Sequence, residues 1–230
     1  ATTEIYTLSL HDALPIFPHS VTLSVGTAAP PDDAFLARVD RAVSGARAAW
    51  HSDHLCYSHV PGVDTAALVP LVFSEEMVET VVRNVRRVKE LVATPFLLEN
   101  VSYYFPVPGG TMGEAAFIRR VLEEADVGML LDVANLFQNA QNLGYSPLAF
   151  LDELPLERVV QLHIAGGESY GGLLLDSHSQ AVPPEVFQLV EEVLRRAPVR
   201  AIILERDEKI PPLPTLLEEL DHARGLFRRF

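Results

Sequence analysis

Short apolar runs alternate six times with longer amphipathic segments, and this alternation restricts the chain to a small set of folds. The runs are rich in β-branched residues and too short to be helices, which predicts strands. They lie at residues 19–25, 50–57, 96–101, 128–133, 159–165 and 201–205. The intervening segments have helical periodicity and lie at residues 33–49, 75–92, 114–125, 148–154, 184–196 and 213–226.

Strands that alternate with helices imply a parallel sheet, because parallel neighbours need long crossovers and the crossover helices cover the sheet. Such a sheet is open or closed into a barrel. A closed (β/α)8 barrel has eight strand–helix units, and six are visible here. We therefore expect one α/β domain over residues 17–230; if its sheet is closed, the domain is a TIM barrel that lacks about its first two units.

Residues 1–16 join this domain abruptly and show no clear amphipathic period. Their second half, SLHDALPI at residues 9–16, resembles translated sequencing-adapter sequence. We expect this segment to be non-native, and a poorly ordered natural terminus is the alternative.

The chain carries 18 basic and 31 acidic side chains, a formal net charge of −13, which argues against non-specific binding to nucleic acid or anionic membranes. Its single cysteine, Cys56, cannot form an internal disulfide, so a reducing compartment is expected. No apolar run approaches the roughly 18 residues of a membrane span. These features predict a cytoplasmic protein.

Every predicted strand contributes at least one imidazole or carboxylate, and further polar residues follow two of them. The candidates are His19, His54, Glu99, Asp132, Asn135, His163, Asp176, His178 and Glu205. In barrels the carboxyl ends of the strands meet at one mouth, where distant ligands can converge. Imidazoles and carboxylates without thiolates favour Fe, Mn or Zn over Cu(I) or an iron–sulfur cluster. About nine such groups need more than one ion.

Each candidate also has a structural interpretation. A lone strand histidine is usually a hydrogen-bonded core residue, Glu99 could be a helix N-terminal charge and Asp132 a cap. This interpretation weakens when it must be repeated on six strands, since unpaired buried charges cost several kcal/mol each. His51, His59 and His222 have no partner pattern and are expected at the surface. Cys56 is expected to pack as a small buried hydrophobe.

Several long motifs carry a family resemblance, in the right order and over nearly everything from residue 17 onward. They are HSVTLSVG (19–26), SDHLCYS (52–58), LLENVSYY (97–104), LLDVANLFQNAQNLGYSPLAFLDELP (130–155), QLHIAG (161–166), GLLLDSHSQAVP (172–183) and ILERDEKIPPL (203–213). With these motifs the chain resembles the multinuclear iron-dependent oxidative enzymes typified by the methanobactin biosynthesis oxidase.

The resemblance implies a xylose-isomerase-like (β/α) barrel with two or three irons, as mixed Fe(II)/Fe(III). It implies O2-dependent modification of cysteines in a ribosomally made precursor peptide, often with a separate protein that presents the peptide. The implied ligands of the central pair are His19, His54, Glu99, Asp132, His163 and Glu205, of which all but His19 are the expected catalytic residues. Asn135, Asp176 and His178 look like the outer site. Ala134 and Gly167 depart from residues common in relatives.

Two other hypotheses remain open. A sugar isomerase or phosphoesterase on a related barrel could use the same ligand types with Mn or Zn. The chain could also be an inactive fragment, because a barrel that lacks two units would leave its sheet edges open.

Overall fold

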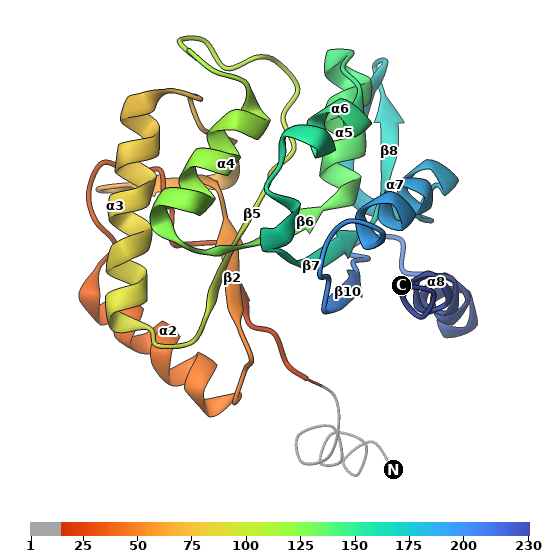
Figure 1. The fold of residues 1–230 in the computed structure, drawn as a ribbon, viewed down its shortest axis with the longest axis horizontal. Helices are drawn as coiled ribbons and strands as arrows, with labels where there is room; N and C mark the ends of the chain where they lie inside the picture. Colours follow the sequence, from red (N-terminus) through yellow and green to blue (C-terminus); the bar gives the residue numbers. More distant parts are fainter. Residues whose placement is uncertain (1–14) are drawn as a thin grey trace.

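A computed structural model describes residues 15–230, in which six strands form one parallel sheet (Figure 1). The strands in sheet order are β1 (His19–Ser20), β2 (His51–His54), β5 (Phe96–Glu99), β6 (Gly128–Asp132), β7 (Val159–Ile164) and β10 (Ala201–Leu204). All six lie within the predicted runs. The first is much shorter than expected, because only His19 and Ser20 pair with β2. Residues 1–14, which hold most of the segment expected to be non-native, lie outside the described residues.

The sheet is strongly curled, so that it forms a half-barrel. The rings of His19 on β1 and His163 on β7 have centroids 5.3 Å apart, although three strands lie between β1 and β7 in the sheet order. In a flat sheet, strands four places apart would be separated by about 19 Å. The expected alternation of strands and helices is therefore present. The curl of the sheet brings side chains from distant strands close together.

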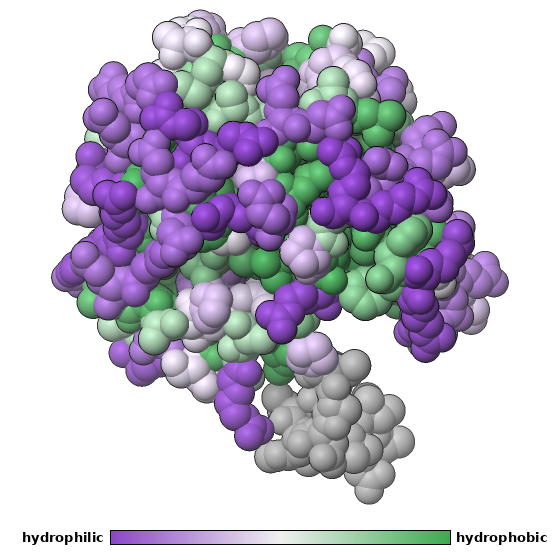
Figure 2. Space-filling view, viewed as in Figure 1, coloured by the Kyte–Doolittle hydropathy of each residue, from purple (hydrophilic) through white to green (hydrophobic). Residues whose placement is uncertain are grey.

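Helices cover the convex side of the sheet and contact one another in sequence around it (Figure 1). They are α2 (Asp33–Gly45), α3 (Glu75–Leu91), α4 (Glu114–Ala125), α5 (Val133–Leu143), α6 (Pro147–Glu153), α7 (Pro184–Leu194) and α8 (Leu213–Phe227), with a 3-10 turn at Leu156–Arg158. The outer surface seen in Figure 2 is largely hydrophilic. Within residues 15–230, no helix has both the length and the apolar character that crossing a bilayer requires.

Alternation along each strand separates two layers of side chains. Leu98, Leu131 and Leu162 face the helices and belong to the main core. The alternate positions face the concave side, where Trp50, Leu97 and Leu130 form a small apolar cluster below the strand ends. The positions two residues after Leu97 on β5 and Leu130 on β6, which are Glu99 and Asp132, therefore point toward the mouth of the half-barrel.

Two antiparallel hairpins follow β2 and β7, and neither was predicted. The first pairs β3 (Cys56–Val60) with β4 (Val63–Pro70), and the second pairs β8 (Gly166–Tyr170) with β9 (Leu173–Gln180). The second turns at Gly171 and Gly172, whose φ angles of 60° and 87° suit a two-residue hairpin loop.

His51 was expected at the surface and is instead 2% exposed. It lies on the helix side of β2 and stacks on Phe96 of the neighbouring strand, with ring centroids 4.7 Å apart. Burial lowers the pKa of His51 to about 4, and nearby carboxylates offset this only in part. The protein therefore folds with a neutral imidazole at this position.

This burial should make stability depend on pH. Between pH 6.5 and 4 the unfolded chain protonates His51 and the folded chain does not, so the free energy of unfolding should fall as pH falls, by roughly 2 kcal/mol at pH 5. Thermal unfolding of His51→Phe, which keeps a ring on Phe96, should show a smaller loss between pH 7.5 and pH 5 than the wild type. His222 is exposed, so His222→Phe is the matched control, and an equal loss in all three proteins would contradict the expectation.

Candidate metal centre

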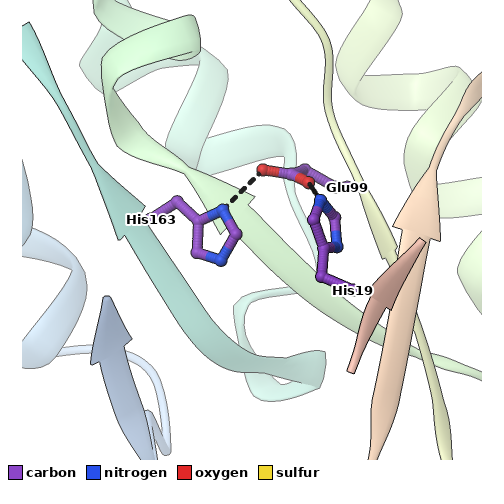
Figure 3. Close-up of side chains that lie close together, drawn as sticks. All are labelled: His19, Glu99 and His163. Atoms are coloured by element: carbon purple, nitrogen blue, oxygen red, sulfur yellow. Dashed lines mark ion pairs between the residues drawn. The ribbon is translucent and has the colours of Figure 1, made fainter. Parts of the chain in front are cut away.

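Three imidazoles meet at the carboxylate of Glu99, the last residue of β5, and Figure 3 shows two of them, those of His19 and His163. Oε2 of Glu99 lies 3.0 Å from Nε2 of His19 and 3.2 Å from Nε2 of His54, and its Oε1 lies 3.0 Å from Nδ1 of His163. The two imidazoles of His19 and His54 are themselves 3.3 Å apart. We call these four residues the inner group.

The charge state of Glu99 reflects these neighbours. Burial raises the pKa of its carboxyl group, but His163 and His19 outweigh burial, and the net effect is a pKa well below the usual range. Burial also lowers the pKa of His54, which its carboxylate neighbours Asp53 and Glu99 raise above its ordinary value. The inner group therefore holds a permanent negative charge among imidazoles.

A second group comes from the ends of β6 and β10 and from the β8–β9 hairpin. Asp132, His178 and Glu205 each offer one atom, and these atoms all lie within 4.8 Å of one another. Nε2 of His178 is 2.7 Å from Oδ1 of Asp176, and Asn135 lines the same cavity. We call these five residues the outer group. Glu205 links the two groups, since its Oε1 is 3.1 Å from His163 and its Oε2 is 3.4 Å from His178.

Carboxyl groups outnumber imidazoles in the outer group. Burial raises the pKa of Asp132 well above its ordinary value, and Glu99 and Asp176 raise it further. Burial lowers the pKa of His178, but Asp176 and the other carboxylates outweigh it and raise it to about 9. An arrangement of this kind attracts cations, because protons or metal ions must balance the buried carboxylates.

Asp207 also reaches this group, although the sequence argument did not include it. Its Oδ2 lies 3.2 Å from Nδ1 of His178. Its spacing in the sequence could have indicated this. Asp207 comes two residues after Glu205, and because side chains alternate along an extended chain, both point toward the mouth of the half-barrel. Arg206 between them points away and binds both carboxylate oxygens of Glu219 on α8, at 3.0 and 3.1 Å.

Both groups surround one cavity of about 270 Å³. Eight of the nine predicted residues line it, and the ninth, His163, lies behind them with 1% exposure. Val21, Leu68 and Val101 supply apolar walls. The structure thus brings together all nine residues that the sequence singled out.

The surrounding backbone holds the outer group in place. Asp132 is the N-cap of α5, where its Oδ1 accepts from the amide of Asn135 at 2.7 Å. Asn100 brackets Asp132 by bonding to both its N–H and its C=O. His178 has a φ of 46°, an unfavourable left-handed conformation for a residue other than glycine. Backbone strain of this kind concentrates at functional sites.

Ser102 and Tyr104, from the loop after β5, fix Asp176. Ser102 donates to its Oδ2 at 2.9 Å, and the Tyr104 hydroxyl accepts from its backbone N–H at 3.2 Å. Tyr103, between them, instead packs inward and is 7% exposed, whereas Phe105 is 63% exposed.

A chain of contacts behind the cavity orients His163. The indole of Trp50 donates to Oε1 of Gln161 at 2.6 Å, and Nε2 of Gln161 lies 2.8 Å from Nε2 of His163. Indole only donates, so the amide oxygen must face Trp50 and the amide N–H must face the ring.

This orientation determines where the proton of His163 sits. Burial lowers the pKa of His163, but Glu205 and Glu99 outweigh it and raise the pKa to about 10. A second proton, however, would place Nε2–H against the amide N–H of Gln161. The geometry therefore places a proton of His163 on Nδ1, where it faces the two carboxylates, and a cation at Nδ1 would have to displace this proton.

The donor atoms fit a metal site. Several buried polar atoms of the two groups lack a hydrogen-bond partner among residues 15–230: Nδ1 of His163, Oε2 of Glu99, Oδ1 of Asn135 and Asp176, and both ring nitrogens of His178. The imidazole and carboxylate atoms among them lie 2.7–3.2 Å from one another or from a neighbouring imidazole or carboxylate without hydrogen-bond geometry, and a shared cation would satisfy them. The set contains only nitrogen and oxygen, which suits Fe, Mn or Zn.

Cys56 takes no part in this arrangement. It is fully buried, and burial with Asp53 and Glu99 raises the pKa of its thiol far above the ordinary value. A thiol held protonated is a poor nucleophile. The expectation of a small, buried cysteine is confirmed.

The fold and the site together define a class: a curled parallel (β/α) enzyme scaffold with a pocket of imidazoles and carboxylates at its strand ends. The family model described as "RiPP precursor modification enzyme MbnB/TglH/ChrH" matches residues 3–228. The chain therefore belongs to this family, as the sequence motifs had indicated, and its members are enzymes that modify ribosomally synthesised peptide precursors.

Curated relatives agree with this assignment. A UPF0276 protein of Anaeromyxobacter sp. (strain Fw109-5) is 39% identical over 210 residues, which is 91% of this chain and 74% of that protein. A UPF0276 protein of Caulobacter vibrioides is 35% identical over 217 residues, 94% of this chain and 78% of that protein.

Solved structures place the fold among sugar-epimerase barrels. D-psicose 3-epimerase from Clostridium cellulolyticum H10 superposes with a TM-score of 0.59 at 14% identity, over 99% of this chain and 82% of that one. The 3-keto-D-glucoside 4-epimerase from E. coli gives 0.56 at 15% identity, over 97% and 84%. At these identities the likeness is one of fold alone, a parallel (β/α) scaffold.

Proposed function

We propose that this chain is a multinuclear non-haem iron oxidase that uses O2 to modify cysteine residues of a ribosomally synthesised precursor peptide. One observation carries the proposal: nine residues with nitrogen or oxygen donors, from the six strand ends, a hairpin and the start of α5, converge on or directly behind a single cavity. Family membership supplies the substrate class, and the donor set supplies the case for a metal such as iron.

More than one ion fits the donors. The inner and outer groups each offer at least three ligand atoms within 4.8 Å of one another. Glu205 reaches both groups with different oxygens, and Glu99 joins three imidazoles. Carboxylates that reach two groups in this way would balance the positive charge of two neighbouring cations. We assign the inner group and Asp132 and Glu205 to a central pair, and Asn135, Asp176 and His178 to a third ion.

Each part of the cavity then has a role. Bound iron would supply the redox electrons for dioxygen and a position for the substrate thiolate. His54, Glu99, Asp132, His163 and Glu205 hold that position and set its charge. Val21, Leu68 and Val101 exclude water from its walls, which strengthens the electrostatic interactions inside.

The partners of this function are a cysteine-containing precursor peptide and a separate protein that presents it. Neither nucleic acid nor a membrane surface is expected as a partner at a formal charge of −13. The lone, buried Cys56 suits a reducing compartment, and we place the protein in the cytoplasm.

A divalent Mn or Zn enzyme acting on a sugar is the second candidate, because two of the superposed barrels are named as sugar epimerases. Isomerisation of that kind consumes no O2. Elemental analysis and oxygen consumption therefore distinguish the two candidates.

Protein purified under anaerobic conditions should contain two or three irons per chain, measured by plasma emission. Iron-loaded protein should consume O2 in the presence of its precursor peptide, and mass spectrometry should find the change on a cysteine. Replacing that cysteine with serine is the control. Stoichiometric Mn or Zn, with turnover that is insensitive to O2, would overturn the proposal.

A further inference from the structure

The concave side of the sheet carries a layer of side chains directly below the inner group. Its members are Ser52, Leu97, Leu130 and Gln161, and each lies two residues before a residue of the candidate metal centre on the same strand. All four are at most 2% exposed. Burial of a polar side chain costs free energy unless the side chain has a hydrogen-bond partner. The two polar members of this layer therefore need partners inside the half-barrel.

Each polar member of the layer contacts one imidazole of the inner group. Nε2 of Gln161 lies 2.8 Å from Nε2 of His163, and the hydroxyl oxygen of Ser52 lies 2.8 Å from Nδ1 of His19. The second contact follows from the strand register, because His19 and Ser52 are paired residues of the parallel strands β1 and β2. The layer thus holds two imidazoles from below.

His19 has the most exposed side chain of the three imidazoles in the inner group. It is 22% exposed, against 10% for His54 and 1% for His163. It also lies on an edge strand that pairs with β2 through only two residues, and Val21, which follows that strand, is 51% exposed. Packing therefore restrains the ring of His19 less than it restrains the other two.

The contact with Ser52 determines which edge of the His19 ring faces the cavity. With Nδ1 at the hydroxyl, Nε2 lies 3.0 Å from Oε2 of Glu99 (Figure 3). A half-turn of the ring would instead direct a carbon atom at the hydroxyl and another at Glu99, and a carbon atom of the ring cannot ligate a metal ion. A hydroxyl both donates and accepts, so the contact remains when a cation binds Nε2 and the proton lies on Nδ1.

We infer that Ser52 is a positioning residue of the metal centre, whose hydroxyl holds the ring of His19 so that the edge strand β1 supplies Nε2 as a ligand. Ser52 does not line the metal cavity, so it acts through His19. Histidines that bind a metal commonly have such a partner at their other ring nitrogen. This inference rests on the proposed function and deepens its account of the central pair.

Four substitutions isolate the hydroxyl of Ser52. Ser52→Ala removes it, and Ser52→Thr and Ser52→Val form a pair of equal shape in which only the threonine keeps a hydroxyl. The matched control is Ser58→Ala. Ser58 is also a buried serine, 7% exposed, but its hydroxyl has no hydrogen-bond partner within residues 15–230 and does not line the metal cavity.

The probe is Co2+ alone, added to metal-free protein, because its visible absorption reports both the affinity and the ligands of the ion. Loss of a residue that orients a ligand costs roughly 10–100-fold in metal affinity. We expect Ser52→Ala to weaken by this factor the binding step that involves His19 and to leave the other steps unchanged. Ser52→Thr should bind at least tenfold more tightly than Ser52→Val, and Ser58→Ala should bind as the wild type does.

A double substitution tests whether Ser52 acts through His19. His19→Ala should weaken the same binding step at least as much, and adding Ser52→Ala to it should cause no further change. A further loss of the full size would overturn the inference, because Ser52 would then act through the fold as a whole.

The wild type separates this inference from the proposed function. If the wild type binds neither Co2+ nor Fe2+, the proposed function is overturned. If the wild type binds Co2+ but Ser52→Ala binds it equally well, or Ser52→Thr binds it as weakly as Ser52→Val, the role of Ser52 is overturned and the metal centre remains.

Discussion

Glu99→Ala protein should purify with little or no iron in the inner group and should lose its oxidative activity. Glu99 places one carboxylate oxygen near His19 and His54 and the other near His163, so its loss leaves three imidazoles without the anion that joins them. Mutation of residues that only orient ligands costs roughly 10–100-fold in metal affinity, and loss of this shared ligand should cost more. Plasma emission and O2 consumption measure the two effects.

Glu114→Ala is the matched control. Glu114 is a half-buried glutamate that accepts a hydrogen bond from the hydroxyl of Tyr103 at 2.8 Å, but it lies on α4 and does not line the metal cavity. Its variant should keep wild-type iron. If both variants retained full iron, Glu99 would be a structural residue and the metal assignment would fail.

Much of this site was predictable because strand geometry leaves few choices. Glu99, Asp132 and His163 lie at the ends of buried runs, and in a curled parallel sheet all such ends open at one mouth. Alternation then decides which of two neighbours faces the mouth. His54 faces it, whereas Asp53 points the other way and accepts from the backbone of Leu23 at 3.0 Å.

Other parts of the fold gave weak signals for physical reasons. Helix α5 was missed because its buried face contains Gln138 and Asn139, which interrupt the apolar period. Asn139 is buried at little cost, since it bonds to the backbone of Val101 and Tyr103. Only the tertiary contact shows that these polar residues face inward.

The local sequence pattern did not predict the two hairpins either. The predicted strand at residues 50–57 runs through two elements, because the chain leaves the sheet after His54 and begins β3 at Cys56. Both are rich in strand-forming residues, and the change of direction depends on contacts far away in sequence, such as Leu55 with the carbonyl of Glu99. His51 was misplaced for the same reason, since its burial depends on Phe96 of the next strand.

Removal of metal should strongly destabilise the protein. Without cations, the carboxyl groups of Glu99, Asp132 and Glu205 share a small cavity, and burial with neighbouring charge raises the pKa of Asp132 well above its ordinary value. A ligand present at a hundred times its dissociation constant stabilises the folded state by about 2.7 kcal/mol. For a chain of this size each kcal/mol corresponds to a shift of about 2–4 °C in Tm, so each ion should contribute roughly 5–10 °C.

Thermal unfolding before and after treatment with a chelator measures this effect, and adding ferrous iron back should restore the Tm. The same treatment of Glu99→Ala should cause a much smaller shift, because that variant has already lost part of its metal. If the histidines are only hydrogen-bonded and hold no metal, a different pattern is expected. The chelator would then change the Tm of neither protein. The Glu99→Ala substitution would itself cause the whole loss of Tm, by leaving the imidazoles of His19, His54 and His163 unpaired. An unchanged wild-type Tm after complete chelation would thus favour a structural cluster over a metal centre.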